Sequence, residues 1–309
     1  MSELILHHYP GSPFSEKIRL VLGYKRMHWR SVIVPVVMPK PDVLALTGRY
    51  RRTPFLQIGS DIYCDSALIC QVIEQHHPEP TIHPASAAGA SQIIAQWADT
   101  DLFWVAIPYT MQPAGAAEIF KGAPPEFMKA FAADRAAMTA GMKRPSTRDA
   151  TAQLHSYLVW LDALLHDGRA FLCGAEASVA DFSVAQSIWY IRRAPAVAGI
   201  LRPFERLAAW FERVNAFGHG VYQAMSSGEA LSLAASRGHH APVSINPELG
   251  YEEDEAVTVT PIDYAQDPVD GMLVGLSHER ITIQRHDERA GTVHVHFPRI
   301  GYQLRKAQD

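Results

Sequence analysis

Ser12 is the residue of this chain that is best placed to do chemistry. It precedes Pro13, and residues 14–22 follow with apolar side chains at helical spacing. Because serine is a preferred N-cap residue and proline a preferred first residue of a helix, the sequence predicts that a helix begins here. The Ser12 hydroxyl would then lie beside the positive end of the helix dipole, where it can donate a hydrogen bond to an anion.

A second segment combines a Thr-Pro pair with an acidic helix start. Thr53-Pro54 opens a predicted strand, a turn follows at 59–61, and a returning strand leads to a helix that begins at Asp65-Ser66. A proline in this position tolerates the cis isomer, which would turn the N–H and C=O of Thr53 outward. The N–H groups at the start of the next helix would bind a carboxylate. We therefore predict a small peptide-like ligand, with its backbone at Thr53 and its acidic end at Ser66.

The elements that would position these residues fall into three regions. Residues 1–80 mix short strands with helices, residues 81–91 are rich in Ala, Ser and Pro as in a linker, and a helical pattern runs from about 92 to 235. Ser178 and Asp181 form a capping pair within this helical region, and we expect loss of Asp181 to cost about 1 kcal/mol or more. One buried stripe of the region is formed by Leu154, Leu158, Leu161 and Leu165.

The C-terminal tail changes to a period of two. Residues 256–260, 280–284 and 292–297 are predicted strands, with a hairpin-sized loop at 287–291. We expect a small β unit that packs as a lid or brace. A contact between subunits, or a cover over the substrate side of the site, is the alternative.

Composition narrows the class of protein. The 309 residues are 48% hydrophobic and 19% charged with a formal net charge of −4, which predicts a soluble chain of two or three domains with no attraction to nucleic acid or anionic membranes. The three cysteines, Cys64, Cys70 and Cys173, form no CxxC pair. No apolar run is long enough to span a membrane, and none follows the basic segment that a signal peptide would have. We expect a cytoplasmic protein with reduced thiols.

These motifs make roughly the first 235 residues resemble the glutathione transferase family. The pattern Tyr-x-x-Ser-Pro-Phe-x-x-Lys-Ile-Arg, which begins at Tyr9, is similar to the serine-type active-site turn of its tau and zeta classes. Thr53-Pro54 and Asp65-Ser66 resemble the paired glutathione motifs of the family. The resemblance implies an α/β thioredoxin-like N-terminal domain and an all-α helical-bundle domain, to which this chain adds a small β-rich module; the expected bounds are 1–80, 90–238 and 244–309.

The resemblance also implies a role for Ser12. Glutathione is a strong nucleophile only as a thiolate. A hydroxyl donor contributes about 1.5–3 kcal/mol to a charged acceptor and a helix N-terminus about 0.3–1 kcal/mol, enough to lower a thiol pKa by roughly two. Ser12 is thus the expected catalytic residue, which donates a hydrogen bond and does not attack. Ser15 and Tyr9 are alternative donors.

Glutathione itself is the expected co-substrate, without a metal. Ser66 would bind its γ-glutamyl carboxylate, Asp65 would face the ammonium group, and Thr53, beside Pro54, would pair with the cysteinyl backbone. The resemblance places Arg52 near the glycyl carboxylate, with Lys40 as a second candidate. The alternative for Arg52 is a solvated charge beside its arginine neighbours.

An apolar electrophile site is expected between the two domains. Its walls would come from the active-site turn and from the first helix after the linker. Most aromatic residues at helical spacing belong to a core, so only one or two of these are expected in the cleft. The candidate lining residues are Tyr9, Phe14, Trp97, Phe103 and Trp104.

Other functions stay open at this stage. The chain could be a fold relative that binds glutathione without turnover, a glutathione-dependent peroxidase or reductase, or an ordinary βαβ-ββα domain whose serines only cap helices. Serine in place of cysteine at position 12 argues against disulfide reduction. The family resemblance implies a homodimer.

The 15 histidines include neighbouring pairs but no recognisable metal motif. His294 and His296 would share one face of a strand, and His239-His240 lies in the preceding connection. A metal site needs three or four converging ligands. Because the sequence shows no such convergence, no metal site is expected.

Overall fold

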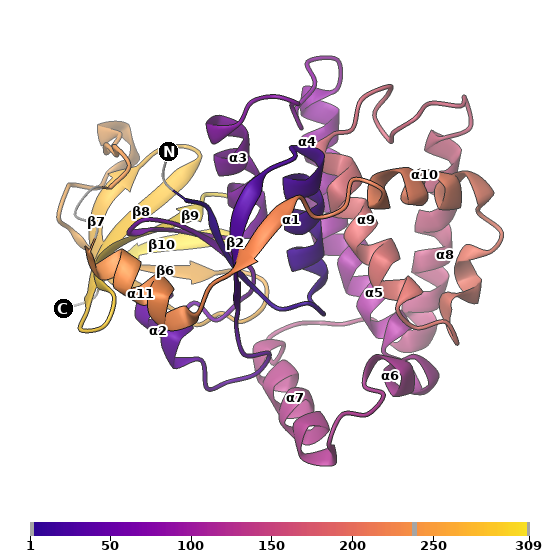
Figure 1. The fold of residues 1–309 in the computed structure, drawn as a ribbon, viewed down its shortest axis with the longest axis horizontal. Helices are drawn as coiled ribbons and strands as arrows, with labels where there is room; N and C mark the ends of the chain where they lie inside the picture. Colours follow the sequence, from indigo (N-terminus) through magenta and orange to yellow (C-terminus); the bar gives the residue numbers. More distant parts are fainter. Residues whose placement is uncertain (1–2, 237–239, 308–309) are drawn as a thin grey trace.

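One mixed β-sheet of ten strands organises the molecule. The computed structural model describes residues 3–236 and 240–307. The strands lie in the order β10-β6-β7-β8-β9-β4-β3-β1-β2-β5. In Figure 1 the late strands occupy the left of the molecule and the long helices occupy the right.

The first part of the chain is a thioredoxin-like α/β unit. β1 runs parallel to β2 and antiparallel to β3, and β3 pairs antiparallel with β4. Helices begin where caps are present, at Ser12 for α1 and at Asp65 for α3, as the sequence predicts. The elements are β1 (Ile5–His8), α1 (Pro13–Tyr24), β2 (His28–Ile33), α2 (Pro41–Thr47), β3 (Phe55–Ile58), β4 (Asp61–Cys64) and α3 (Ser66–His76).

A helical domain follows. Its first helix runs continuously through α4, the π-helical turn η1 and α5. The predicted stripe of Leu154, Leu158, Leu161 and Leu165 is confirmed, since these side chains are at most 2% exposed. The elements are α4 (Ala88–Trp97), η1 (Ala98–Leu102), α5 (Phe103–Thr110), α6 (Pro113–Ile119), α7 (Pro125–Met138), α8 (Thr147–Leu164), α9 (Val179–Arg192), η2 (Ala198–Leu201) and α10 (Glu205–Asn215).

The chain then returns to the sheet. β5 pairs in parallel with β2, and α11 packs against α2 and β9. The expected domain boundary at 238 lies outside the described residues. The remaining elements are β5 (Val221–Ala224), α11 (Ser227–Ser236), η3 (Pro247–Leu249), β6 (Ala256–Pro261), β7 (Val269–Leu276), β8 (Arg280–Asp287), β9 (Gly291–Pro298) and β10 (Tyr302–Lys306).

The C-terminal β extension, β6 to β10, is a continuation of the first sheet. The three predicted strands appear as β6, β8 and β9, and β9 pairs in parallel with β4, with Asp61 opposite His294 and Tyr63 opposite His296. An edge strand offers unpaired N–H and C=O groups, and β9 satisfies those of β4. The module is thus joined to the thioredoxin-like unit through backbone hydrogen bonds.

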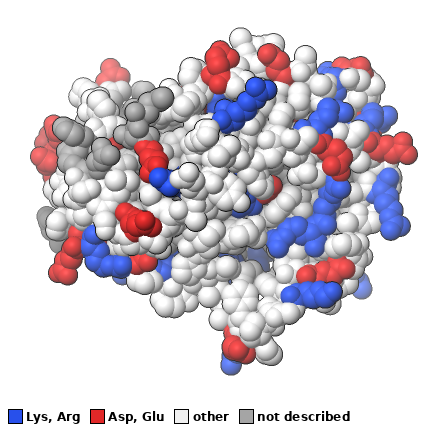
Figure 2. Space-filling view, viewed as in Figure 1, with Lys and Arg blue, Asp and Glu red and all other residues white. Residues whose placement is uncertain are grey.

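Alternate residues of the strands face two separate cores. Leu6 of β1 and Leu56 of β3 belong to the core shared with the helical domain, whereas their neighbours Ile5 and Phe55 belong to the core formed with α2, α11 and the extension. Figure 2 shows basic and acidic side chains of the described residues intermixed over one face of the molecule. Within the described residues, no helix has both the length and the apolar character needed to cross a bilayer.

Candidate active site

Ser12 occupies the N-cap position of α1. Its Oγ accepts a hydrogen bond from the Ser15 N–H at 3.2 Å, and the residue is buried. Accepting this bond leaves the hydroxyl hydrogen able to donate to a ligand. Ser12 lines a cavity of about 1130 Å³, the larger cavity, whereas Ser15 lines neither of the two cavities described below and its Oγ has no hydrogen-bond partner among the described residues.

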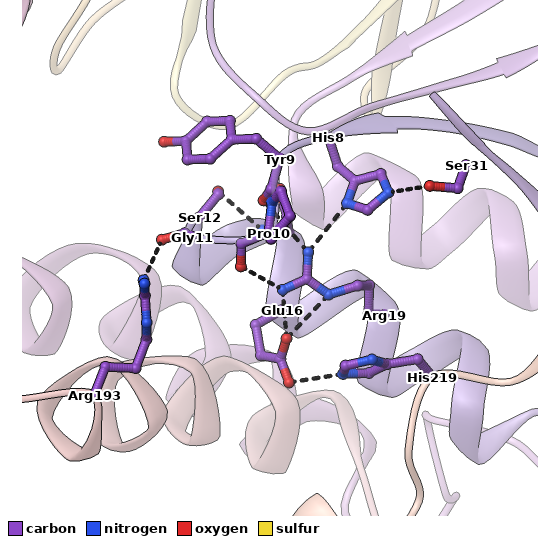
Figure 3. Close-up of polar contacts among 11 residues, drawn as sticks. His8, Tyr9, Pro10, Gly11, Ser12, Glu16, Arg19, Ser31, Arg193 and His219 are labelled. Atoms are coloured by element: carbon purple, nitrogen blue, oxygen red, sulfur yellow. Dashed lines mark hydrogen bonds and ion pairs between the residues drawn. The ribbon is translucent and has the colours of Figure 1, made fainter. Parts of the chain in front are cut away.

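Two arginines hold the turn that precedes this N-cap (Figure 3). Arg19 donates to the carbonyl of Tyr9 at 3.4 Å and to that of Pro10 at 3.0 Å. Arg193, from the helical domain, donates to the carbonyl of Gly11 at 3.0 Å. The carbonyls of this turn are thus paired with cations, and the turn places Ser12 on the larger cavity, which Arg193 also lines.

Arg19 is itself fixed by a buried network. Its Nη2 pairs with Glu16 Oε2 at 2.5 Å, and Glu16 Oε1 accepts from His219 at 2.9 Å. Burial would raise the pKa of Glu16, but the hydrogen bond from His219 and the charge of Arg19 lower it. Burial and Arg19 lower the pKa of His8 to about 3, so its neutral ring accepts from Arg19 at 3.1 Å and donates to Ser31 at 2.8 Å.

The Thr53-Pro54 and Asp65-Ser66 pairs line a smaller cavity of about 550 Å³ beside the first. The Thr53-Pro54 peptide bond is cis, as the sequence suggested. Thr53 borders both cavities, and its Oγ1 is buried without a hydrogen-bond partner among the described residues. Asp65 caps α3 by accepting from the Ala67 N–H at 2.9 Å.

Lys17 is a site residue to which the sequence analysis gave no role. It is fully buried, and its Nζ lies 3.3 Å from Ser66 Oγ and 2.5 Å from Asp99 Oδ2. Burial would lower the pKa of Lys17, but the charge of Asp99 raises it, so the ammonium group stays charged beneath the N-terminus of α3. Asp99 lies in the π-helical turn η1 and also accepts from Gln186 at 2.7 Å. Lys17 is the lysine of the sequence motif that begins at Tyr9, and its place in that motif was the signal that could have identified it as a site residue.

The C-terminal extension reaches directly into the site. The loop between β6 and β7 places Asp263 and the carbonyl of Tyr264 on the guanidinium of Arg52, whose carbon lies 3.9 Å from the centroid of the Tyr264 ring. Tyr302 of β10 donates to Asp65 Oδ2 at 3.1 Å. Arg52 is therefore not a solvated charge: it is paired with the extension.

The larger cavity has aromatic and apolar walls. Of the predicted lining residues, Tyr9, Phe14, Phe103 and Trp104 surround it, and the rings of Phe14 and Phe103 lie 4.6 Å apart. Tyr264 borders both cavities and meets Trp104 edge to face at 5.3 Å. The sequence analysis missed the outer wall, which comes from α6, α7 and the loop that joins them: Phe120, Phe127, Phe131 and Met138.

Two predicted residues are placed differently from the rest. Trp97 lines neither cavity; its ring packs edge to face against Tyr157 at 5.0 Å, beside the main core. Lys40 does line the larger cavity, and its Nζ donates to the Arg51 carbonyl at 3.2 Å. Burial, together with Arg135 and despite Asp134, lowers the pKa of Lys40 to about 8.

Comparison with family models and with solved structures identifies the family. The family model for the glutathione S-transferase N-terminal domain matches residues 6–81, and the model for the glutathione S-transferase C-terminal domain matches residues 126–213. A GST-like protein from Pseudomonas syringae has a similar structure, with 38% sequence identity, a TM-score of 0.82, and coverage of 99% of this chain and 100% of that chain. The chain belongs to the glutathione S-transferase family.

The extension distinguishes this transferase-family protein from more distant relatives. A glutathione S-transferase from Rhodospirillum rubrum F11 has 22% identity and a TM-score of 0.53, and the match covers 69% of this chain and 88% of that one. A likeness at that level shows the fold alone. The Pseudomonas syringae match extends over nearly the whole chain, so it includes the extension. No curated protein sequence matches the chain.

Proposed function

We propose that this protein binds glutathione, stabilises its thiolate with Ser12, and transfers it to a small apolar electrophile. The observation that carries the proposal is the placement of Ser12 on the larger cavity and of Asp65 and Ser66 on the adjoining smaller one, with Thr53 on both. One extended tripeptide could then lay its γ-glutamyl end at Ser66 and its sulfur at Ser12. The electrophile would occupy the aromatic part of the larger cavity.

The chemistry follows from the groups around Ser12. The hydroxyl can donate to the sulfur, and the first N–H groups of α1 add their partial positive charge. An ordinary thiol has a pKa of about 8.5, so a shift of roughly two would leave the bound thiol mostly ionised at neutral pH. Since no group needs to deprotonate Ser12, a base beside it is not required.

A pH titration of bound glutathione tests this role. The thiolate absorbance of the wild-type complex should have a titration midpoint well below that of free glutathione. Ser12→Ala should raise this midpoint by about one to two pH units, because the change removes only the hydroxyl. Ser15→Ala is the matched control, with an unchanged midpoint expected. An unshifted midpoint in the wild-type complex would refute the proposal.

A glutathione-binding protein without turnover is the second candidate. It is favoured by Arg52 and Asp65, which already have partners in the extension. Retention on immobilised glutathione without activity toward a chlorinated nitroarene would support it. Activity that falls in Ser12→Ala would instead support the transferase.

We also propose a homodimer in a reducing cytoplasm. All three cysteines are free thiols, which agrees with a compartment where glutathione is reduced. Ile93 of α4, an early helix of the second domain, is 73% exposed and is a candidate contact. Sedimentation that gives only a monomer would contradict the dimer.

A further inference from the structure

Four ligand-type side chains converge where the extension joins the first domain. Asp61 begins β4, His294 and His296 lie on one face of β9, and His240 comes from the connection that precedes the extension. The parallel pairing of β4 with β9 sets Asp61 directly opposite His294. Asp61, His294 and His296 are all buried. Sequence reasoning could not find this cluster because three separate segments build it.

Three of these residues bring ligand atoms close to one another. Asp61 Oδ1 lies 3.6 Å from His240 Nδ1 and 3.9 Å from His294 Nδ1, and the two imidazole rings stack with centroids 3.6 Å apart. One ligand atom from each of the three residues lies within 4.8 Å of the others. Tetrahedral zinc with bonds of about 2.0–2.2 Å places its ligand atoms about 3.3–3.6 Å apart, so the two distances from Asp61 are close to those required. Because the lone pairs of stacked rings lie in parallel planes, the half-buried His240 ring would rotate out of the stack to direct its nitrogen at the same ion.

His294 has an unused lone pair at this point. Its Nε2 lies 3.3 Å from Gln284 Oε1, an amide oxygen that can only accept, so Nε2 carries the proton and Nδ1 is bare. Nδ1 has no hydrogen-bond partner among the described residues, although His294 is only 7% exposed. This bare nitrogen and the carboxylate oxygen of Asp61, 3.9 Å apart, are two donor atoms that one cation could share.

The surrounding contacts hold the carboxylate in place. His296 Nε2 donates to Asp61 Oδ1 at 2.9 Å, and the Thr282 hydroxyl lies 2.9 Å from His296 Nδ1. The Ala241 N–H donates to Asp61 Oδ2 at 2.8 Å. Outer hydrogen bonds of this kind fix the ligands of protein metal sites.

We propose that Asp61, His240 and His294 bind one divalent transition-metal ion, with zinc as the preferred ion and water in the fourth position. Two imidazoles and one carboxylate form a donor set that suits zinc. The ion would tie β4, β9 and the connection before the extension together at a single point. The site is separate from the glutathione cavities: none of its three ligands lines either of them.

Metal binding by the full-length, untagged chain in glutathione-free buffer tests the proposal. After treatment with a chelator, the wild type should take up one equivalent of Zn²⁺ by elemental analysis. With Co²⁺ it should show the visible absorption of a tetrahedral ion, and Zn²⁺ should raise its melting temperature. His240→Gln, a change at a half-buried position, should weaken binding roughly tenfold or more and abolish the rise.

His286→Gln is the matched control, because His286 is an exposed histidine on β8. It should bind the metal as the wild type does. Binding well below one equivalent in the wild type would overturn the proposal without reference to any variant. Equal binding by the wild type and His240→Gln would also overturn it, since the ion would then lie elsewhere on the chain.

Discussion

At the residue scale, Lys17 adds a positive charge to the place proposed for the γ-glutamyl carboxylate. The N–H groups at the start of α3 provide partial charges, and the buried ammonium group behind Ser66 adds a full one. Asp99 keeps that ammonium group charged and fixes its position. The γ-glutamyl carboxylate would therefore meet a charged and rigid receptor.

We expect Lys17→Met to weaken glutathione binding by roughly 10- to 100-fold, because a hydrogen bond to a charged group contributes about 1.5–3 kcal/mol. Isothermal titration calorimetry would measure the affinity. The single change leaves Asp99 buried without its cation, which destabilises the fold. The double variant Lys17→Met/Asp99→Asn removes that penalty and should still bind weakly; wild-type affinity in the double variant would contradict the role.

The residues of the site divide by whether local sequence determines them. Ser12 and Asp65 could be predicted because each caps the helix that follows it within a few positions. The partners of Arg52 could not, because Asp263 lies 211 residues further along the chain. Lys17 and Asp99 are likewise brought together only by the packing of α1 against the second domain. Local signals predict caps and turns, whereas long-range pairs depend on the packing of distant elements.

At the element scale, α9 begins with a capping pair that also joins three segments. Asp181 is fully buried and accepts from the N–H groups of Leu172 and Ser178 and from the indole of Trp210, at 2.8–2.9 Å. Burial raises the pKa of Asp181, while these donors act to lower it. The pair therefore holds α9, α10 and the preceding loop in one arrangement.

Replacing Asp181 with Ala should lower the free energy of unfolding by about 3 kcal/mol or more, because several buried donors lose their acceptor at about 1–3 kcal/mol each. Urea unfolding would measure the loss. Asp149→Ala is the matched control, since Asp149 pairs with Ser146 at the exposed start of α8 and should cost about 1 kcal/mol or less. Equal losses in the two variants would show that burial of the pair does not matter.

The strands of the extension show what periodicity does and does not predict. A period of two identifies 256–260, 280–284 and 292–297 as strands, because alternate residues face a core. It does not say which strand edge they join. β9 pairs with the open edge of β4, a strand more than 200 residues earlier in the chain. Because local periodicity carries no signal for such a distant partner, the sequence suggested a separate module where the structure has one continuous sheet.

At the scale of the whole molecule, the continuous sheet brings the extension to the candidate active site. β4 leads into Asp65, and β9 lies against β4, so the loop between β6 and β7 and the start of β10 are carried to the same edge. Asp263, Tyr264 and Tyr302 then contact Arg52 and Asp65. The extension thus forms a wall of the smaller cavity, and in the proposed glutathione site it would compete with the ligand for Arg52.

Asp263→Asn should therefore tighten glutathione binding. The carboxylate of Asp263 occupies the guanidinium expected to meet the glycyl carboxylate of glutathione, and this partly exposed ion pair is worth up to about 1 kcal/mol, or about fivefold in affinity. Calorimetric titration of both proteins would measure the change. Asp267→Asn is the control, because Asp267 lies in the same loop but pairs with Arg51 at 3.2 Å, so the affinity should stay as in the wild type. If Asp263→Asn weakened binding instead, the extension would support the ligand and not compete with it.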